Sequence, residues 1–394
     1  MDYQNKYIDL ILGVSLSLQQ GEALSINTSE RNLEFAQIVA QKASEITLIP
    51  VSIVLIEEGI VKDVFSVTPI ENELISEESL YKVLLRIEDP FLIEEFPKVP
   101  MKEIASSTVL LQAVRNLGPP QLTKVVAPWA VAPVPSLFWA KSLFQTENPV
   151  DDMWALFARL LFLDEPNFPF SYTEHLKKLN SMTKRMIQSN KKYLHIKDDK
   201  TDLYVKLVHN SYPRHKLTLL EGTRVFMPTL FNHGISMIVE TTYTHGKLFS
   251  SRPFLLLGEL VEEAQLVFEG GKVVSFEAKR GKKALEVALQ IDEGALRIGL
   301  MSLVEEKSVI AHLPTFGSTP IDESVTSFIT LGMGESNHLR ELDTYGDEQE
   351  LSAKTGLNTS VLKGRIPFGN NFLAVDMYDD EGDIPIMVNG NFIQ

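Results

Sequence analysis

The chain of 394 residues contains no cysteine. This absence excludes disulfide bonds, thiol catalysis and zinc sites built from cysteine. Basic residues are also scarce, because 37 Lys and Arg face 52 Asp and Glu and leave a net charge of −15. Nucleic acids and anionic membranes both require a concentrated basic face, so neither is an expected partner. A small basic pocket is still compatible with this charge.

Long apolar runs are missing as well. The longest, such as ALFARLLFL (155–163), are too short or too charged to cross a bilayer. The N-terminal MDYQNKYIDLIL lacks the basic stretch, long apolar run and small-residue cleavage site of an export signal. We therefore expect a cytoplasmic protein with no membrane partner.

Familiar site motifs are absent too. The sequence has no G-x-G-x-x-G after a strand, no phosphate loop ending in G-K-[ST] and no H-E-x-x-H. The acidic DDEGD (379–383) lacks the twelve-residue calcium pattern ending in Glu, so we expect a solvated hairpin turn. His209 and His215 have no carboxylate at matching spacing, which favours exposed loop histidines over a shared metal.

What the sequence does contain is a globular composition, with 44% hydrophobic and 23% charged residues. Its first part has helical spacing over 3–18, a strand ALSINT (23–28), a helix within 29–45 and a strand IPVSIVLI (49–56). This order predicts a βαβ unit and a parallel sheet covered by helices. For the helix, Ser29 is the expected N-cap, and the expected apolar face is Leu33, Phe35, Ile38 and Val39. LLRIEDP (84–90) and SSTVLLQAV (106–114) fit further strands of the same sheet.

The pattern of apolar and polar residues changes in the second half of the chain. Residues 151–193 are helical in pattern, and from about 201 apolar and polar residues alternate as in antiparallel strands. QLVFEGGKVVSFEAKRG (265–281) adds a hairpin signal at EGG. We predict an N-terminal α/β domain with a parallel sheet at 1–200 and a mostly antiparallel, β-rich domain at 201–394.

Eight segments then carry a family resemblance. They are SLSLQQGEALSINT (15–28), LLRIEDP (84–90), APWAVAPVPSLFWAK (127–141), EGTRVFMPT (221–229), FEGGKVVSFEAKRG (268–281), DEGALRIGLMSLV (292–304), DESVTSFITLGMGE (322–335) and GLNTSVLKGR (356–365). In order and spacing they resemble the aminopeptidase T/aminopeptidase S family of dinuclear metallo-aminopeptidases. The resemblance covers most of the chain and implies a homodimer that encloses the active-site cavity.

In that family, two glutamates, two histidines, a tyrosine and an aspartate hold two divalent cations such as zinc or cobalt. The resemblance places Arg224 and Leu300 at the glutamate positions, Phe328 and Lys363 at the histidine positions, Glu335 at the tyrosine position and Arg365 at the aspartate position. Of these six side chains, only that of Glu335 can coordinate a cation, since Lys and Arg offer no lone pair at neutral pH. We therefore expect no metal cofactor and no catalytic residue, and we predict an inactive member of the family.

Three of the six positions have become cationic, and buried cations need partners. Glu335, Asp322, Glu323 or an anionic ligand could supply them. Lys363 and Arg365 stand two apart on an extended segment, so both side chains should face the same way. Glu323 precedes Phe328 by five residues, which on a single helix places the two side chains on different faces.

Three interpretations follow from these substitutions. The six positions could line a cavity for an anionic ligand, such as a carboxylate-bearing peptide or metabolite. The cations could instead only form internal salt bridges, in a protein with a scaffold role. The third interpretation is an active aminopeptidase with non-standard ligands or with an unrecognised site, for instance one built from His233, Glu240 and His245.

Overall fold

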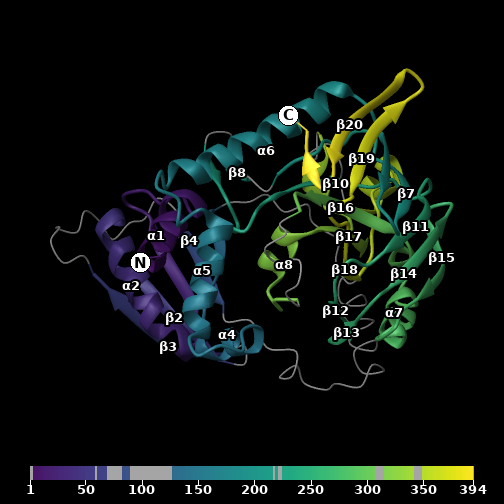
Figure 1. Ribbon diagram of the computed structural model, residues 1–394. Helices are drawn as coiled ribbons and strands as arrows, with labels where there is room; N and C mark the ends of the chain where they lie inside the picture. Colours follow the sequence, from purple (N-terminus) through teal and green to yellow (C-terminus); the bar gives the residue numbers. More distant parts are fainter. Residues whose placement is uncertain are drawn as a thin grey trace. The chain divides into compact units, whose positions relative to one another are not determined.

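The computed structural model in Figure 1 describes residues 3–57, 60–68, 82–88, 127–215, 218–220, 224–306, 315–340 and 348–393. The chain forms two compact units, which are described separately below. Unit 1 contains residues 1–92, 124–176 and 216–232, and unit 2 contains residues 93–123, 177–215 and 233–394. The domain boundary at residue 200 stays a prediction, because compactness does not test whether either part folds alone.

Unit 1 is built around a five-stranded sheet with strand order β3-β2-β1-β4-β5. Its strands are β1 (Ala23–Thr28), β2 (Val51–Glu57), β3 (Ile60–Val67), β4 (Lys82–Glu88) and β5 (Trp129–Pro133). β1 pairs in parallel with β2 and β4, β4 pairs in parallel with β5, and β3 is antiparallel to β2. The predicted βαβ unit and parallel sheet are thus confirmed.

The helices of unit 1 precede, connect and follow these strands. They are α1 (Tyr3–Leu10), the π-helix η1 (Ile11–Ser15), the short 3₁₀ helix η2 (Glu30–Asn32), α2 (Leu33–Thr47), α4 (Leu137–Leu143), α5 (Pro149–Leu161) and the start of α6 (Phe170–Ser189). A small hairpin of β8 (Thr218–Leu220) and β9 (Arg224–Phe226) completes the unit. Within the described residues, no helix combines the length and the apolar character needed to cross a membrane.

Two details of helix α2 differ from the prediction. Ser29 precedes η2, whereas α2 itself begins at Leu33 with Asn32 at its N-cap. Ile38 is 37% exposed, so it is not part of the buried face. Phe35 and Val39 are buried together with Ala36, Ala40 and Ala43, and these alanines complete the buried face of the helix in place of Ile38. The strand predicted at 106–114 lies outside the described residues.

Unit 2 contains two larger antiparallel sheets. The first has strand order β15-β14-β11-β7-β6-β19-β20-β21, and the second has order β10-β16-β17-β18. Their strands are β6 (Tyr193–Lys197), β7 (Asp202–Lys206), β10 (Gly234–Ile238), β11 (His245–Phe249), β14 (Gln265–Glu269), β15 (Lys272–Glu277), β16 (Ile298–Val304), β17 (Ser327–Gly332), β18 (Lys363–Phe368), β19 (Ala374–Asp379), β20 (Gly382–Val388) and β21 (Asn391–Phe392). This architecture confirms the expected antiparallel, β-rich part.

Shorter elements surround these sheets. They are the two-stranded β12 (Phe254–Leu256) and β13 (Glu259–Val261), the remainder of α6, and α7 (Lys282–Leu289), η3 (Gly294–Leu296), α8 (Thr319–Val325), η5 (Ser336–His338) and α9 (Glu348–Thr355). The hairpin predicted at EGG joins β14 to β15, with Gly270 and Gly271 at φ of 53° and 81°. The predicted DDEGD turn is also confirmed, since it joins β19 to β20.

One of the two loop histidines is not exposed. His209 lies at the surface as expected, but His215 is buried. The reason is a backbone bridge between Arg214 and Ser236, which holds this segment against β10. Burial lowers the pKa of His215 to about 4.

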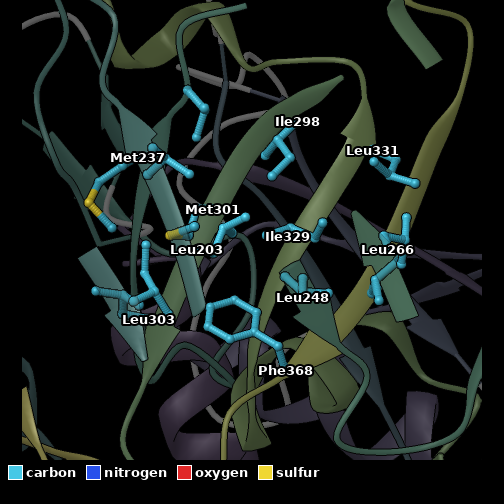
Figure 2. Close-up of a cluster of buried hydrophobic side chains, with 14 of the residues drawn as sticks. Leu203, Met237, Leu248, Leu266, Ile298, Met301, Leu303, Ile329, Leu331 and Phe368 are labelled. Carbon is cyan, nitrogen blue, oxygen red and sulfur yellow. The ribbon is translucent and has the colours of Figure 1, made fainter. Parts of the chain in front are cut away.

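The core of unit 2 defines which face of the four-stranded sheet remains for a site. Figure 2 shows Met301 and Ile329 of this sheet packed with Leu203, Leu248 and Leu266 of the eight-stranded sheet. Successive residues of a strand point to opposite faces. The residues between these core positions therefore point away from the core, to the face on which the candidate site is built.

Candidate functional site

Four of the six predicted positions share this outer face of the four-stranded sheet. In register, Leu300 lies opposite Thr330 and Thr330 opposite Arg365, while Phe328 lies opposite Pro367 and Lys363 opposite Gly332. Directly opposed residues of antiparallel strands point to the same side, as do residues two apart. Leu300, Phe328, Lys363 and Arg365 therefore lie on one face, and the predicted common orientation of Lys363 and Arg365 is confirmed.

A pocket of about 240 Å³ lies against this face, entirely within unit 2. Its charged lining residues are Arg252, Asp322, Glu323, Lys363 and Arg365, and its apolar lining residues are Pro253, Phe254, Leu255, Phe328 and Pro367. Three of the six predicted positions, Phe328, Lys363 and Arg365, thus line one pocket. Leu300 is buried on the same sheet face without lining the pocket.

Backbone contacts hold the pocket walls together. The amide of Ser251 donates to the carbonyl of Pro367 at 3.1 Å, which ties the segment carrying Arg252 to β18. Elsewhere in the lining, the carboxylate of Asp322 accepts hydrogen bonds from the Phe316 amide at 2.8 Å and the Thr315 hydroxyl at 2.9 Å. These bonds fix the loop that leads into α8.

Both pocket cations of β18 are paired with carboxylates. The ammonium of Lys363 contacts Glu335 Oε1 at 2.9 Å, and the guanidinium of Arg365 forms an ion pair with Glu323. The side chains of Lys363 and Arg365 remain 38% and 31% exposed, whereas that of Glu323 is only 7% exposed. The two side chains are therefore held in place and keep part of their surface exposed, although Arg365 Nε itself is buried.

The GMG sequence at 332–334 has a structural role next to this site. Gly332 has a φ of 94°, and a Cβ atom there would stand 2.2 Å from the carbonyl oxygen of Leu362. Glycine is required for that conformation and for the close approach of the two strands. The turn follows the last residue of β17 and leads to Glu335, which places this carboxylate beside Lys363.

Arg224 belongs to unit 1, where it forms a buried ion pair with Glu22. The side chains are only 9% and 1% exposed. Arg224 Nη2 also donates to Glu22 Oε2 at 3.0 Å and to the carbonyls of Leu16 and Ser17 at 2.8 and 2.6 Å. The guanidinium therefore joins β9 to the turn between η1 and β1.

Burial changes the titration of two pocket groups. It raises the pKa of Asp322 to about 6, although the hydrogen bonds from Phe316 and Thr315 and the charge of Arg252 oppose the rise. Burial lowers the pKa of Arg252, while the carboxylates of Asp322 and Glu306 act in the opposite direction. The pocket thus contains a carboxyl group whose charge changes slightly below neutral pH.

The expectation that Glu323 and Phe328 face different ways is wrong. It assumed that both lie on a single helix, but α8 ends at Val325 and Phe328 lies in strand β17. The change of element between them turns the chain so that both side chains line the pocket. The helical period of 3.6 residues does not apply across that boundary.

Sequence patterns did not indicate two further residues, namely Arg252, which lines the pocket, and Glu22, the ion-pair partner of Arg224. Arg252 lies in SSRPF, more than 100 positions before Arg365, and no spacing rule connects them. Glu22 lies 202 positions from Arg224. In the sequence, Glu22 is only an acidic residue directly before the predicted strand at 23–28. Nothing in that position identifies its ion-pair partner.

The alternative set of His233, Glu240 and His245 does not form a metal group. Glu240 accepts hydrogen bonds from Thr242, and the ring of His245 stacks on that of Tyr204 with centroids 4.8 Å apart. In the part of the chain that the structure describes, no cluster of three or more His, Asp or Glu side chains could hold a metal ion.

The residues at the six positions do not fit two divalent cations. The side chains of Leu300 and Phe328 have no atom that can coordinate a metal. Lys363, Arg365 and Arg224 are cations that already form ion pairs with carboxylates. A dinuclear centre needs several anionic or imidazole ligands to hold its cations and to lower the pKa of a bound water. No step of a reaction is therefore derived through metals at these positions.

Comparison with known proteins identifies the class of the chain. The sequence profile of the thermophilic metalloproteases (M29) matches residues 2–392, so the chain belongs to this family. Aminopeptidase T of Thermus thermophilus is 24% identical over 407 residues, covering 98% of each chain. Aminopeptidase AmpS of Bacillus subtilis is 22% identical over 98% of each, and aminopeptidase PepS of Streptococcus thermophilus is 21% identical over 98% of this chain and 97% of its own.

A solved structure agrees with this assignment. The fold matches that of wild-type AmpT from Thermus thermophilus with a TM-score of 0.79 and 22% sequence identity. The alignment covers 100% of this chain and 99% of the other. The family resemblance inferred from the eight sequence segments is thus confirmed, and the fold is the one that it implied.

Proposed function

We propose that this chain is a member of the aminopeptidase family that binds a small carboxylate-bearing ligand and does not hydrolyse peptides through a dinuclear metal centre. The observation that carries the proposal is the pair of accessible cations, Lys363 and Arg365, on one wall of the unit 2 pocket. Both occupy positions at which the resemblance implies metal ligands. A ligand carboxylate would interact with these cations as the cations' own carboxylate partners do.

The exposed fractions favour this role over a purely structural one. A guanidinium or ammonium group used only for internal pairing is expected to be buried and bonded within the protein, as Arg224 is through Nη1 and Nη2. Lys363 and Arg365 instead retain accessible surface next to apolar walls, the usual composition of small-molecule sites. The homodimer implied by the resemblance stays a prediction.

A metal and activity assay tests the catalytic half of the proposal. The purified protein would be analysed for bound zinc, cobalt and manganese and assayed with leucyl p-nitroanilide, with and without a chelator. We expect substoichiometric metal and no chelator-sensitive turnover. Stoichiometric metal with turnover lost on chelation would instead establish an active aminopeptidase with non-standard ligands.

A thermal-shift experiment tests the binding half. We expect a carboxylate of suitable size, such as 4-methylpentanoate at millimolar concentration, to raise the melting temperature of the parent protein and not of Lys363→Met. If no carboxylate has an effect, and Lys363→Met lowers the melting temperature without ligand, the pocket cations have only a scaffold role.

A further inference from the structure

The charges around the pocket are balanced. Arg252, Lys363 and Arg365 contribute three positive charges, while Asp322, Glu323 and the Lys363 partner Glu335 contribute three negative charges above the pKa of Asp322. Glu306 does not line the pocket, but its carboxylate interacts electrostatically with Arg252 and adds a further negative charge nearby. A ligand that carries a positive charge beside its carboxylate therefore suits this lining better than a carboxylate alone.

Charges of opposite sign are also in direct contact within the lining. Glu323 and Arg365 form an ion pair, and both line the pocket. A molecule with a cationic and an anionic group on neighbouring atoms could bind across this pair, with each group next to its opposite. An α-amino acid has this arrangement, because its ammonium and carboxylate groups are attached to the same carbon.

The remaining walls determine what the rest of the ligand can be. Pro253, Phe254, Leu255 and Phe328 present apolar surface. The volume of about 240 Å³ is smaller than the roughly 300–1,000 Å³ typical of pockets for drug-sized ligands. The space suits a molecule the size of one amino acid with an apolar side chain.

We propose that the ligand of this pocket is a free α-amino acid with an apolar side chain, bound as a zwitterion across the Glu323–Arg365 pair. Its carboxylate lies at Arg365 and Lys363, its ammonium group lies at Glu323, and its side chain lies against Phe328 and Phe254. This inference rests on the proposed function and names the ligand class of the same site.

Four small molecules separate the contributions of the two charges. L-leucine carries both charges on one carbon, and 4-methylpentanoate and 3-methylbutylamine each lack one of them. 6-Aminohexanoate is an isomer of leucine whose two charges stand at opposite ends of the chain. By isothermal titration calorimetry of the full chain at pH 7.5, we expect L-leucine to bind at least tenfold more tightly than each of the other three.

The calorimetry distinguishes failure of this inference from failure of the proposed function. If 4-methylpentanoate binds as tightly as L-leucine, the pocket recognises carboxylates only, so the zwitterion inference is overturned and the proposed function survives. If 6-aminohexanoate matches L-leucine, the neighbouring-charge argument is wrong. If none of the three carboxylate-bearing molecules binds, both proposals fail.

Charge-neutral variants assign each group to its partner. Glu323→Gln should remove the preference for L-leucine over 4-methylpentanoate, and Glu263→Gln, which breaks an exposed ion pair with Lys279, should leave that preference intact. Should Glu323→Gln fail to fold, Lys363→Met provides a second test. It should weaken L-leucine and 4-methylpentanoate by a similar factor and leave 3-methylbutylamine unchanged; weakening of all three by one factor would contradict the assignment.

Discussion

Arg224 in unit 1 and the Lys363–Arg365 pair in unit 2 are cations with different surroundings. All three cations stand where the family resemblance implies metal ligands, and all three are paired with carboxylates. Arg224 is nearly inaccessible and also bonds two backbone carbonyls. Lys363 and Arg365 keep about a third of their side-chain surface exposed at a pocket.

Cations to which the resemblance assigns one kind of position therefore differ in burial and pairing. A cation that is paired and bonded inside the protein stabilises the fold, and removing it leaves a buried carboxylate without its ion-pair partner. A cation that is paired on one side and accessible on the other contributes little to stability and remains able to bind a ligand. Substitutions of these residues should therefore differ in their effect on stability, and the largest effect is considered first.

The largest effect is expected for Arg224→Met in unit 1. The variant leaves Glu22 buried without its ion-pair partner, so we expect a loss of about 3–5 kcal/mol in the free energy of unfolding, measured by urea denaturation. The double variant Arg224→Met with Glu22→Met should recover most of this loss, because no buried charge is left unpaired. A loss below about 1 kcal/mol would place Arg224 in the same class as the pocket cations.

The next effect concerns the pH dependence of stability through Asp322. Its pKa in the folded protein, about 6, lies above the usual 3.8, so the folded state takes up a proton more readily than the unfolded chain. Relative to Asp322→Asn, the parent should therefore gain stability as the pH falls from 7.5 to 4.5. Over this pH range the gain should be about 2 kcal/mol, at about 1.4 kcal/mol for each of the roughly 1.5 pH units between the folded-state pKa and pH 4.5.

The difference between parent and variant is the quantity to measure, because burial also raises the pKa of Glu88, Glu306 and Asp376. Those groups are present in both proteins and cancel. A difference that is constant across this pH range would show that Asp322 titrates normally and that the pocket is well hydrated.

A smaller effect on stability is expected for Lys363→Met. Partly exposed ion pairs contribute about 0–1 kcal/mol, so the free energy of unfolding should change by less than about 1 kcal/mol. Lys279→Met, which removes an exposed pair with Glu263, is the matched control and should be equally mild. A loss as large as that of Arg224→Met would remove the contrast between the two regions.

The smallest effect is expected from metal ions. A cation at 1 mM with a Kd of 1 μM would stabilise the folded state by about 4 kcal/mol. Because the six positions lack a suitable donor set, we expect zinc, cobalt and manganese to leave the melting temperature unchanged. A reproducible increase that Glu335→Gln abolishes would show that Glu335 still takes part in a metal site.

Local sequence patterns were sufficient for much of the fold. The short segment ALSINT and the β-branched residues of IPVSIVLI predicted β1 and β2, and the paired glycines at 270–271 predicted the β14–β15 hairpin. These features depend on neighbouring residues and on fixed backbone periods. The prediction for Glu323 and Phe328 failed because one period was applied across a change from helix to strand.

For the candidate site, the sequence by itself determined which chemistry the six positions can offer. Side chains of Leu, Phe, Lys and Arg provide no metal ligand in any fold. Only the tertiary structure decided how the cations are used, because burial, pairing and access depend on residues far apart in the chain. It paired Arg224 with Glu22 across 202 positions and brought Arg252 to the pocket of Lys363 and Arg365, contacts that no local pattern encodes.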